Sequence, residues 1–390
     1  MDSNARTAMR VGIDVTAVLR GPGGMARYAR ELTTALGDVD RETRIIPLSV
    51  GSGCPTVVPR RPGSRPPNAA GAERAFRLQT LLAHMVGASQ ERRFPLLDLF
   101  HGTDNLLPAF RRVGTVLTLH DFVFRLFPRT TAPLNRLYLK LAMPHFLRRA
   151  DALIAVSNST RMDAERLYGV TPQRVHVVPL GVSERFAPRD PGAVRRSLGD
   201  RYRLPVDFLL HVGALEPRKN LQVLLEALRW MGDERPTLVL AGPPGRGVRE
   251  IRDDPAAVYG DGRVISLGPV PEEDLPGLYS LARAFVFPSL YEGFGLPVLE
   301  AMACGTPVLC SKAAALEEVV GDGALRVDAE DVAGWAEAVR ALWSRSGLRQ
   351  ELRRRGFRRA RGFTWAATAQ KTLEVYKEVH ARRSGCSNRH

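Results

Sequence analysis

The chain has 390 residues, of which 44% are hydrophobic, and this is enough to build two substantial cores. No apolar run in it approaches the roughly 18 residues of a membrane-spanning helix. Its start, MDSNARTAMRVGIDV, lacks the apolar stretch of a secretory signal peptide, and no two of its four cysteines form a CxxC pair. We therefore expect a two-domain cytoplasmic protein with reduced thiols.

The formal net charge is +15, and much of it lies in RSGLRQELRRRGFRRARG, residues 345–362. Nucleic acid, anionic lipid and phosphorylated substrates are the partners that such an excess favours. The chain shows no nucleic-acid-binding motif, so we expect no nucleic-acid partner. Two interpretations stay open: arginines that are merely solvated, and peripheral contact with the inner face of the cell membrane.

In the first half of the chain, short apolar segments alternate with helical patterns. The strand predicted at 10–18 leads through a glycine-rich loop into a helix, whose apolar residues recur at three- and four-residue steps from Met25 to Leu36. Segment 51–70 is rich in Gly, Pro and Arg, which predicts a mobile loop. Further strands are predicted at 97–102, 114–121, 151–157 and 174–182.

After a link at about 183–205, the alternation starts again. Helices are predicted at 220–231 and in the segments DLPGLYSLA, LPVLEAMAC and LEEVVG. Repeated βα units with short connections predict an α/β protein with two Rossmann-like, doubly wound parallel sheets facing a cleft. Ligand loops gather at the carboxyl ends of such strands. The strands of this half are predicted at 208–215, 237–243, 263–270, 284–289, 307–311 and 324–328.

The first candidate site is the glycine-rich segment RGPGGMARYAREL. Gly21, Gly23 and Gly24 permit tight turns and close approach of a ligand to the backbone. The start of the helix that follows offers free N–H groups and the positive end of its dipole, which suits a diphosphate. A purely structural turn is an equally good interpretation of the loop alone. The pattern is neither GxGxxG nor a Walker loop, so it disfavours NAD and P-loop chemistry.

The second candidate is the pair Arg218 and Lys219 in HVGALEPRKNLQVLLEAL. The pair lies between a predicted strand end and a helix start. Arginine offers phosphate a planar fork of donors, and lysine adds a point charge. A solvated basic pair is the alternative, but the strand–loop–helix context favours a phosphate site.

The third candidate lies in PSLYEGFGLPVLEAMACGTPV, residues 288–308. If a helix starts near Leu296, Glu300 falls in its second turn and its side chain leans back over the helix start. A carboxylate accepts two hydroxyl donors, which suits the 2′ and 3′ hydroxyls of a ribose. Glu292, in the loop, would accept from sugar hydroxyls. A solvated Glu300 is disfavoured because the residues around it are apolar.

The fourth candidate is His120, which with Asp121 ends a predicted buried strand in VLTLHDFVF. Catalytic side chains gather at such strand ends, although a lone histidine is more often structural. The eight histidines show no HxH or HxxxH spacing, and no DxD motif is present to carry Mg²⁺. We therefore expect neither a metal nor any other cofactor.

These segments together resemble glycosyltransferase family 4, whose members are retaining enzymes with the GT-B fold. YEGFGLPVLEAMACGTPV is similar to the family's Glu-x7-Glu signature, GALEPRKN to its diphosphate-binding element, and GPGGMARYARELTTAL to its N-terminal glycine loop. TLHD is similar to the N-terminal histidine segment, and FTWAATAQKTLEVYKEV to the last helix, which crosses back onto the N-terminal domain. The resemblance implies an N-terminal acceptor domain, 1–183 plus 365–390, and a donor domain, 184–364.

The resemblance also implies a role for each candidate residue. Glu300 would hold the ribose of a nucleoside-diphosphate sugar, and His120 would lie near the C6 hydroxyl of the transferred sugar. Arg218 and Lys219 would neutralise the diphosphate. The donor site would further include Gly23, Gly24, Gly213, Val270, and Glu292 with the backbone of Gly293, Phe294, Gly295 and Leu296; the catalytic group would be His120, Arg218, Lys219 and Glu292.

The expected activity is transfer of a hexose from GDP-mannose or a UDP- or dTDP-hexose to an acceptor hydroxyl, without a metal. The acceptor stays open between a glycan, a glycolipid and a small molecule. Segment 124–141 mixes aromatic and basic residues, so it could seat a lipid-linked acceptor at a membrane or form an ordinary packed helix. Two other functions stay open: a hydrolysing nucleotide-sugar epimerase, and a nucleotide-binding pseudo-transferase.

Overall fold

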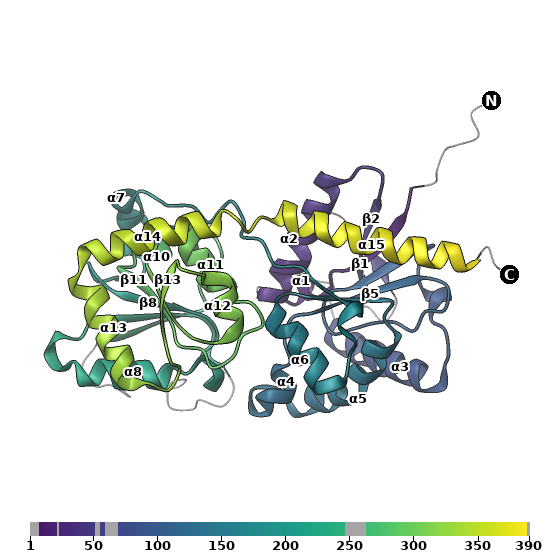
Figure 1. Cartoon of the computed structure of the whole chain (residues 1–390), viewed down its shortest axis with the longest axis horizontal. Coiled ribbons are helices and arrows are strands. Elements are labelled where there is room, and N and C mark those ends of the chain that lie inside the picture. Colours follow the sequence, from purple (N-terminus) through teal and green to yellow (C-terminus); the bar gives the residue numbers. More distant parts are fainter. Residues whose placement is uncertain (1–7, 22, 51–54, 59–68, 246–262, 388–390) are drawn as a thin grey trace. The chain divides into compact units, whose positions relative to one another are not determined.

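The structure is a computed structural model of the whole chain, and it describes residues 8–21, 23–50, 55–58, 69–245 and 263–387. The chain divides into two compact units (Figure 1). Unit 1 consists of Met1–Phe122, Pro133–Gly181 and Trp365–His390, and unit 2 of Val123–Ala132 and Val182–Thr364.

Unit 1 is built on a seven-stranded sheet with the order β3-β2-β1-β4-β5-β6-β7. Every neighbouring pair is parallel except β2 and β3, which are antiparallel. The central strands are buried on both faces, which explains why their sequences are continuous apolar runs. The strands are β1 Arg10–Asp14, β2 Arg44–Ser49, β3 Thr56–Val57, β4 Leu99–Gly102, β5 Gly114–Leu119, β6 Ala152–Ala155 and β7 Val175–Val177.

The helices of unit 1 include the last helix of the chain, α15, which packs along α2 (Figure 1). A buried row of hydrogen bonds joins α15 to the sheet and to α2. Tyr376 contacts Nδ1 of His101 at 2.6 Å, Nε2 of His101 contacts Thr118 Oγ1 at 2.7 Å, and Thr118 contacts the Tyr28 hydroxyl at 2.8 Å. The helices are α1 Thr16–Arg20, α2 Gly24–Val39, α3 Ala69–Val86, α5 Pro133–Arg149, α6 Asn158–Tyr168 and α15 Trp365–Ser387.

Unit 2 is built on a six-stranded, wholly parallel sheet with the order β10-β9-β8-β11-β12-β13. The strands are β8 Leu209–Val212, β9 Leu238–Ala241, β10 Val264–Gly268, β11 Ala284–Phe287, β12 Val308–Ser311 and β13 Ala324–Val327. The helices are α4 Val123–Leu126, α7 Pro191–Val194, α8 Leu221–Trp230, α10 Leu275–Leu281, α11 Leu296–Ala303, α12 Ala314–Val320, α13 Val332–Ser344 and α14 Ser346–Ala360.

The core of unit 2 shows how sequence spacing selects the buried face. In α8 the residues Leu221, Leu224, Leu225 and Leu228 recur at helical spacing and are all buried with the strands β8 and β9. Trp335 of α13 fills the same core and donates its indole N–H to the carbonyl oxygen of Asp328 at 2.9 Å. The core of unit 2 thus contains the buried faces of two helices that lie more than a hundred residues apart in the sequence.

The predicted fold class, two doubly wound parallel sheets, is confirmed, and each predicted strand has its counterpart in the structure. Of the apolar positions that indicated helix α2, Met25 is 39% exposed, whereas Ala29 and Leu32 are buried together with Tyr28. One detail of the prediction is wrong. The predicted loop 51–70 contains β3 and the first residues of α3, while 51–54 and 59–68 lie outside the described residues.

Sequence reasoning missed β2, which carries Pro47 and lies beside β1 with Ile13 opposite Pro47. A proline weakens the strand signal, and pairing with β1 overrides it. The units differ from the expected domain ranges at two points: the first ends at Gly181, and Val123–Ala132 groups with unit 2, where Phe127 stacks on Tyr291 with ring centroids 5.8 Å apart. No helix among the described residues is long and apolar enough to span a membrane.

Candidate active-site residues

The predicted basic pair of unit 2 meets the predicted loop glutamate. Lys219 Nζ lies 2.6 Å and Arg218 Nη1 lies 3.0 Å from the same atom, Oε1 of Glu292. Arg218 is also held by Glu216, whose Oε2 accepts from its Nε at 3.0 Å. Lys219 and Glu292 are both buried. One ionic cluster therefore contains two cations, Arg218 and Lys219, and two carboxylates, Glu216 and Glu292. We call it the cation cluster.

The strand ends of the unit 2 sheet place this cluster. The 3-10 turn Pro217–Lys219 follows β8, and Asn220 ends it in the left-handed conformation with φ of 53°. The loop after β11 joins the turn through a backbone hydrogen bond, Leu290 N to Arg218 O, of 2.8 Å. The Lys219 ammonium lies 4.6 Å from the centroid of the Phe287 ring at the end of β11. Such a position over an aromatic ring further stabilises a cation.

The cluster keeps Glu292 ionised although it is buried. Burial by itself raises the pKa of a carboxyl group, but the charges of Lys219 and Arg218 outweigh that cost and lower the pKa of Glu292 to about 2. Burial also lowers the pKa of Lys219, against the attraction of Glu292. Perturbed ionisable groups of this kind gather at functional sites.

His211, which sequence reasoning passed over, lies on β8 directly before the cluster. Its ring is fully buried, stacks on Phe287 and contacts the carbonyl oxygen of Val286 through Nδ1 at 3.1 Å. Burial and the neighbouring Lys219 lower its pKa to about 4, so the ring is neutral at pH 7. Because a carbonyl oxygen can only accept, Nδ1 carries the proton and Nε2 is an acceptor.

Glu300 lies on α11, which begins at Leu296 as predicted from the sequence. Its side chain is 2% exposed, and the hydroxyl of Tyr279 donates to its Oε2 at 3.1 Å. The interpretation of Glu300 as a solvated helix residue is therefore wrong. The structure thus holds the two predicted glutamates differently: Glu292 by cations, and Glu300 by a tyrosine hydroxyl.

The other predicted donor residues of unit 2 lie just after strands β8 and β10 and in the loop before α11. Gly213 follows β8 with φ of 149°, and a side chain there would approach Lys219 Nζ and His211 Nε2. Gly295 caps α11 with φ of 107°, and a Cβ atom on it would meet Leu316 at 2.5 Å, so only glycine fits. Gly293 lies in the same loop, Phe294 is buried and packs edge-on against Phe363, and Val270 lies just beyond β10.

In unit 1, His120 lies at the end of β5 as predicted. Its Nε2 lies 2.8 Å from the carbonyl oxygen of Thr103, and its ring forms a T-shaped pair with the ring of Tyr28, with centroids 4.8 Å apart. Burial lowers its pKa, so the neutral ring donates through Nε2 and Nδ1 remains an acceptor. The backbone oxygen of His120 accepts from Thr160 Oγ1 at 3.2 Å, which fixes the strand end.

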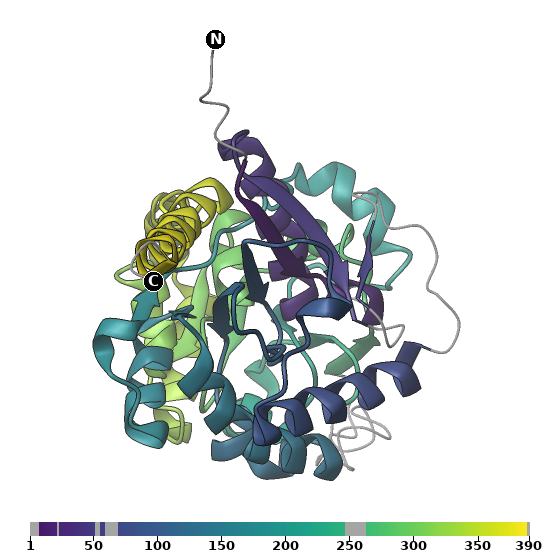
Figure 2. The same ribbon diagram turned by 90° about the vertical axis from the view of Figure 1, so that its right-hand side faces the viewer.

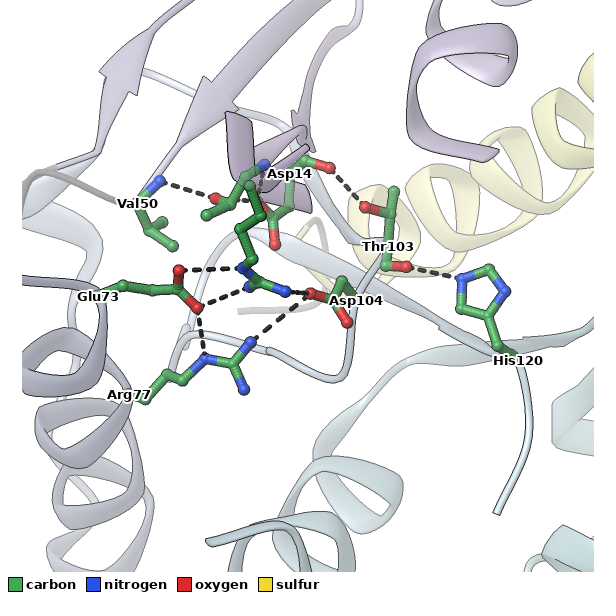
Figure 3. Close-up of polar contacts among 9 residues, drawn as sticks. Asp14, Val50, Glu73, Arg77, Thr103, Asp104 and His120 are labelled. Atoms are coloured by element: carbon green, nitrogen blue, oxygen red, sulfur yellow. Dashed lines mark hydrogen bonds and ion pairs between the residues drawn. The ribbon is translucent and has the colours of Figure 1, made fainter. Parts of the chain in front are cut away.

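A second polar group at the strand ends of unit 1 was not predicted (Figure 3). Arg20, on α1, forms ion pairs with Glu73 of α3 and with Asp104, which follows β4. Arg77 contacts the same two carboxylates, Glu73 at 2.9 Å and Asp104 at 3.6 Å. Together with Asp14, this set of five side chains is called the acidic cluster below.

Asp14 ends β1 and is 1% exposed. Its Oδ1 accepts from the amide and the hydroxyl of Thr16, at 2.9 and 2.5 Å, while no described residue hydrogen-bonds its Oδ2. Burial raises its pKa to about 6 in spite of the Thr16 contacts. A carboxyl group with a pKa near neutrality at a strand end is suited to accept hydrogen bonds from a bound hydroxyl.

Gly23 and Gly24, predicted to bind phosphate, form the start of α2. Gly23 is the N-cap residue, its carbonyl oxygen accepts from the Arg27 amide at 2.9 Å, and a Cβ at either glycine would meet no atom within 4 Å. Both are exposed. The helix start is thus accessible from solvent, as an anion site requires.

The residues that sequence reasoning missed had weak local signals. A single acidic residue ending an apolar strand, as in GID, is a cue that could have found Asp14. Arg20 and Asp104 lie 84 residues apart, so no spacing rule connects them. Tyr279 likewise has no local signal, because nothing in the sequence of its helix marks it as the partner of Glu300.

Comparison with known proteins settles the family. The sequence model of the glycosyl transferases group 1 matches residues 203–359, and that of Glycosyltransferase Family 4 matches residues 22–186. The O-antigen chain mannosyltransferase B of Escherichia coli is 32% identical over 91% of this chain and 96% of its own length. The chain belongs to glycosyltransferase family 4. The resemblance inferred from the sequence is confirmed, and this glycosyltransferase is an enzyme of that family.

A further relative and two solved structures are also similar to this glycosyltransferase. The D-inositol 3-phosphate glycosyltransferase of Xylanimonas cellulosilytica is 32% identical over 93% of each chain. The sucrose-phosphate synthase of Thermosynechococcus elongatus shares the fold with a TM-score of 0.71 and 20% identity, covering 96% of this chain and 100% of that one. Anabaena Alr3699/HepE in complex with UDP-glucose gives a TM-score of 0.68 and 18% identity, covering 95% and 100%. These structures show the GT-B fold of the chain.

Proposed function

We propose that the enzyme transfers a hexose, mannose being favoured, from a nucleoside-diphosphate sugar to a hydroxyl of a glycan acceptor, with retention of the anomeric configuration and without a metal. The preference for mannose is supported by the Escherichia coli O-antigen mannosyltransferase, which matches over nearly the whole chain. The observation that carries the proposal is the cation cluster at the strand ends of unit 2.

The cation cluster is suited to stabilise a departing diphosphate. Negative charge builds on the leaving group as the glycosidic bond breaks, and cations fixed nearby stabilise that state more than the ground state. Lys219 and Arg218 are held rigidly, one over the Phe287 ring and one by Glu216, so little reorganisation is needed. This arrangement supports a reaction in which the protein supplies the positive charge that a metal ion supplies in other transferases.

Glu300 and Glu292 would accept hydrogen bonds from hydroxyl groups of the donor. The Tyr279 hydroxyl orients the buried Glu300 carboxylate, which would accept from the ribose hydroxyls. Glu292 offers an ionised carboxylate whose Oε1 is committed to the two cations, so its other oxygen would accept from the transferred sugar. The base would lie near Val270, beyond β10.

The acidic cluster of unit 1 supports a neutral hydroxyl acceptor. Its two arginines are matched by Glu73 and Asp104, which leaves Asp14 as an additional carboxyl group at the strand ends. A phosphorylated acceptor, such as the name of the Xylanimonas relative indicates for that enzyme, would meet unfavourable charge there. A sugar hydroxyl would find an acceptor in Asp14 and in Nδ1 of His120.

Retention is proposed to occur by front-face attack, with a phosphate oxygen of the leaving group taking the proton of the acceptor. The alternatives are weaker. An epimerase that hydrolyses nucleotide sugars needs further acid and base residues, which we do not identify. A pseudo-transferase is disfavoured because Arg218, Lys219, Glu292 and Glu300 are all present and buried or partly buried together with structured partners.

The test is a screen of GDP-mannose, UDP-hexoses and dTDP-hexoses for thermal stabilisation and for slow hydrolysis, with Glu300→Ala and the exposed-glutamate variant Glu351→Ala side by side. The true donor stabilises the parent and Glu351→Ala but not Glu300→Ala. The anomeric configuration of the product is read by NMR, and activity is measured with and without EDTA. An inverted product, loss of activity in EDTA, or stabilisation of Glu300→Ala by the same donor contradicts the proposal.

A further inference from the structure

His211 is a buried histidine with one ring nitrogen that makes no hydrogen bond. It lies on β8, its side chain is 0% exposed, and its ring stacks on that of Phe287 with centroids 5.5 Å apart. Nδ1 donates to the carbonyl oxygen of Val286 at 3.1 Å, but no described residue hydrogen-bonds Nε2. A buried polar atom without a partner costs free energy, so its presence in a folded protein requires an explanation.

A second buried histidine shows the pattern of a purely structural role. His101 of β4 is also fully buried, but both of its ring nitrogen atoms have partners, Tyr376 at Nδ1 and Thr118 at Nε2. Tyr376 belongs to α15, the yellow helix that is seen nearly end-on in Figure 2. His101 thus joins a helix to a sheet with both nitrogen atoms, whereas His211 keeps one acceptor available.

Nε2 of His211 borders the space beside Gly213. A Cβ atom on Gly213 would lie 3.7 Å from this nitrogen and 3.8 Å from Nζ of Lys219. Gly213 has a φ of 149°, a conformation that other residue types rarely adopt, so a residue without a side chain separates the two groups. A hydrogen-bond acceptor and an ammonium group therefore border the same small space.

The Lys219 ammonium has more donors than its carboxylate partner uses. It carries three N–H groups, and the hydrogen bond to Oε1 of Glu292, at 2.6 Å, takes one of them. The ammonium also lies 4.6 Å from the centroid of Phe287, the ring on which His211 stacks. A second N–H group can therefore be directed at Nε2 of His211 without loss of the contact with Glu292.

From this geometry we propose that His211 is a positioning residue, which holds the Lys219 ammonium in its charged form through the lone pair of Nε2. The role given to that charge, stabilising a departing diphosphate, rests on the proposed function. Because the carbonyl oxygen of Val286 fixes Nδ1 as the donor, the neutral ring presents Nε2 as an acceptor. Its attraction for a cation is strong in a buried site, where water screens it little.

The charges that face Lys219 show why an additional acceptor matters. Burial lowers the pKa of this lysine, Glu292 raises it, Arg218 lowers it and Glu216 raises it. Burial and, after it, the charge of Lys219 lower the pKa of His211 to about 4. The ring is therefore uncharged at neutral pH, and it attracts the ammonium instead of repelling it.

The experiment reads the charge of Lys219 directly by NMR. The chain has five lysines, so labelling the full chain with carbon-13 at lysine Cε gives five signals, and Lys219→Met identifies one of them. The pKa of Lys219 is compared in the parent, in His211→Phe, which keeps a ring on Phe287 without an acceptor, and in His211→Gln, whose amide oxygen can replace Nε2. His211→Phe lowers this pKa by about one to two units, and His211→Gln restores most of it.

Two further readings support the comparison of variants. The other four lysines are internal controls, since they lie on α5, directly after β12 and on α15, and their pKa values should not change. The nitrogen-15 signals of the His211 ring need no substitution at that position, so they decide the question if a variant does not fold. They should show Nε2 unprotonated at neutral pH and should shift with the same midpoint as the Lys219 signal.

Three results contradict this role of His211. The first is an equal pKa of Lys219 in the parent and in His211→Phe. The second is an equally low pKa in His211→Gln and His211→Phe, which would assign the effect to packing of the ring. The third is a proton on Nε2 at neutral pH. The proposed function fails separately if Lys219→Met keeps the kcat of the parent, because the NMR readings require no donor.

Discussion

The polar cluster at the strand ends of unit 1 has more carboxylates than cations, whereas in unit 2 two cations share one oxygen of a buried carboxylate. Asp14 and Glu292 are both almost completely buried, yet the pKa of Asp14 rises to about 6 and that of Glu292 falls to about 2. Asp14 has hydrogen bonds from Thr16, while Glu292 lies against Lys219 and Arg218. Burial alone therefore does not decide the ionisation of these groups; the charges that share the site do.

The same comparison matches the two halves of the proposed reaction. In unit 2 the side chains are arranged around positive charge, which suits a departing diphosphate. In unit 1 they present acceptors for hydrogen bonds, which suits an incoming hydroxyl. Substitutions in the two arrangements should therefore differ in the property that they change and in the size of that change.

The largest effect is expected from Lys219→Met. This change leaves Glu292 buried with only one of its two cations, which should lower the free energy of unfolding by about 3–5 kcal/mol. It should also lower kcat about 10²- to 10³-fold, because a fixed charge near the leaving group is lost. Urea unfolding and initial rates with the identified donor measure both.

The matched control for this change is Lys312→Met, since Lys312 is exposed and lies 3.8 Å from an exposed Asp328. It should cost at most about 1 kcal/mol and leave kcat unchanged. Adding Glu292→Gln to Lys219→Met should restore part of the stability and none of the activity. A Lys219→Met enzyme that is both stable and active would show that the cation cluster is not catalytic.

The pH dependence of stability should have opposite signs for the two buried carboxylates. The pKa of Asp14 is raised, so its stabilising contribution is present below about pH 4 and is lost as the pH rises through about 6. The pKa of Glu292 is lowered, so its contribution is present above about pH 4.5 and is lost as the pH falls toward 2. Each shift corresponds to a change on the order of 3 kcal/mol.

Urea unfolding of Asp14→Asn and Glu292→Gln at several pH values checks this prediction. Asp14→Asn should gain stability relative to the parent between pH 4 and 7. Glu292→Gln should be less stable than the parent at pH 7, and the difference should shrink below pH 4.5. Parallel curves for parent and variant would contradict the assigned shift for that residue.

The smallest effects are expected from removing one hydroxyl in each unit. Tyr279→Phe in unit 2 removes the donor to Glu300, so the KM for the nucleotide sugar should rise about 5- to 10-fold. Tyr376→Phe in unit 1 removes the hydroxyl next to His101, so it should cost about 1–2 kcal/mol of stability and leave that KM unchanged. Equal changes of KM in both variants would show that Tyr279 has no special role at the donor site.

Much of unit 2's site could be predicted because its signals are local. The apolar run of α11 with Glu300 inside it, and the start at Leu296, follow from helical spacing and from the glycine-containing loop before it. The position of Arg218 and Lys219 between a strand and a helix is likewise visible in the sequence. The contact of both cations with one oxygen of Glu292 is not visible in the sequence, because Lys219 and Arg218 lie 73 and 74 positions before Glu292.

Helix α3 shows a different limit of prediction from the sequence. Helix α3 was not predicted, because Leu78, Leu82, Met85 and Val86 point outward while Phe76 and Leu81 point inward. Apolar residues on both sides of a helix blur the one-sided stripe that marks a surface helix.

The sequence by itself determined the two doubly wound sheets, the family, and the loops that carry chemistry, because strand alternation and glycine-flanked motifs are properties of neighbouring residues. Only the tertiary structure decided which charges meet: Glu292 with Lys219 and Arg218, and Arg20 with Glu73 and Asp104. Those pairings depend on which strand ends the sheet order brings together, and sheet order is set by packing of the whole unit.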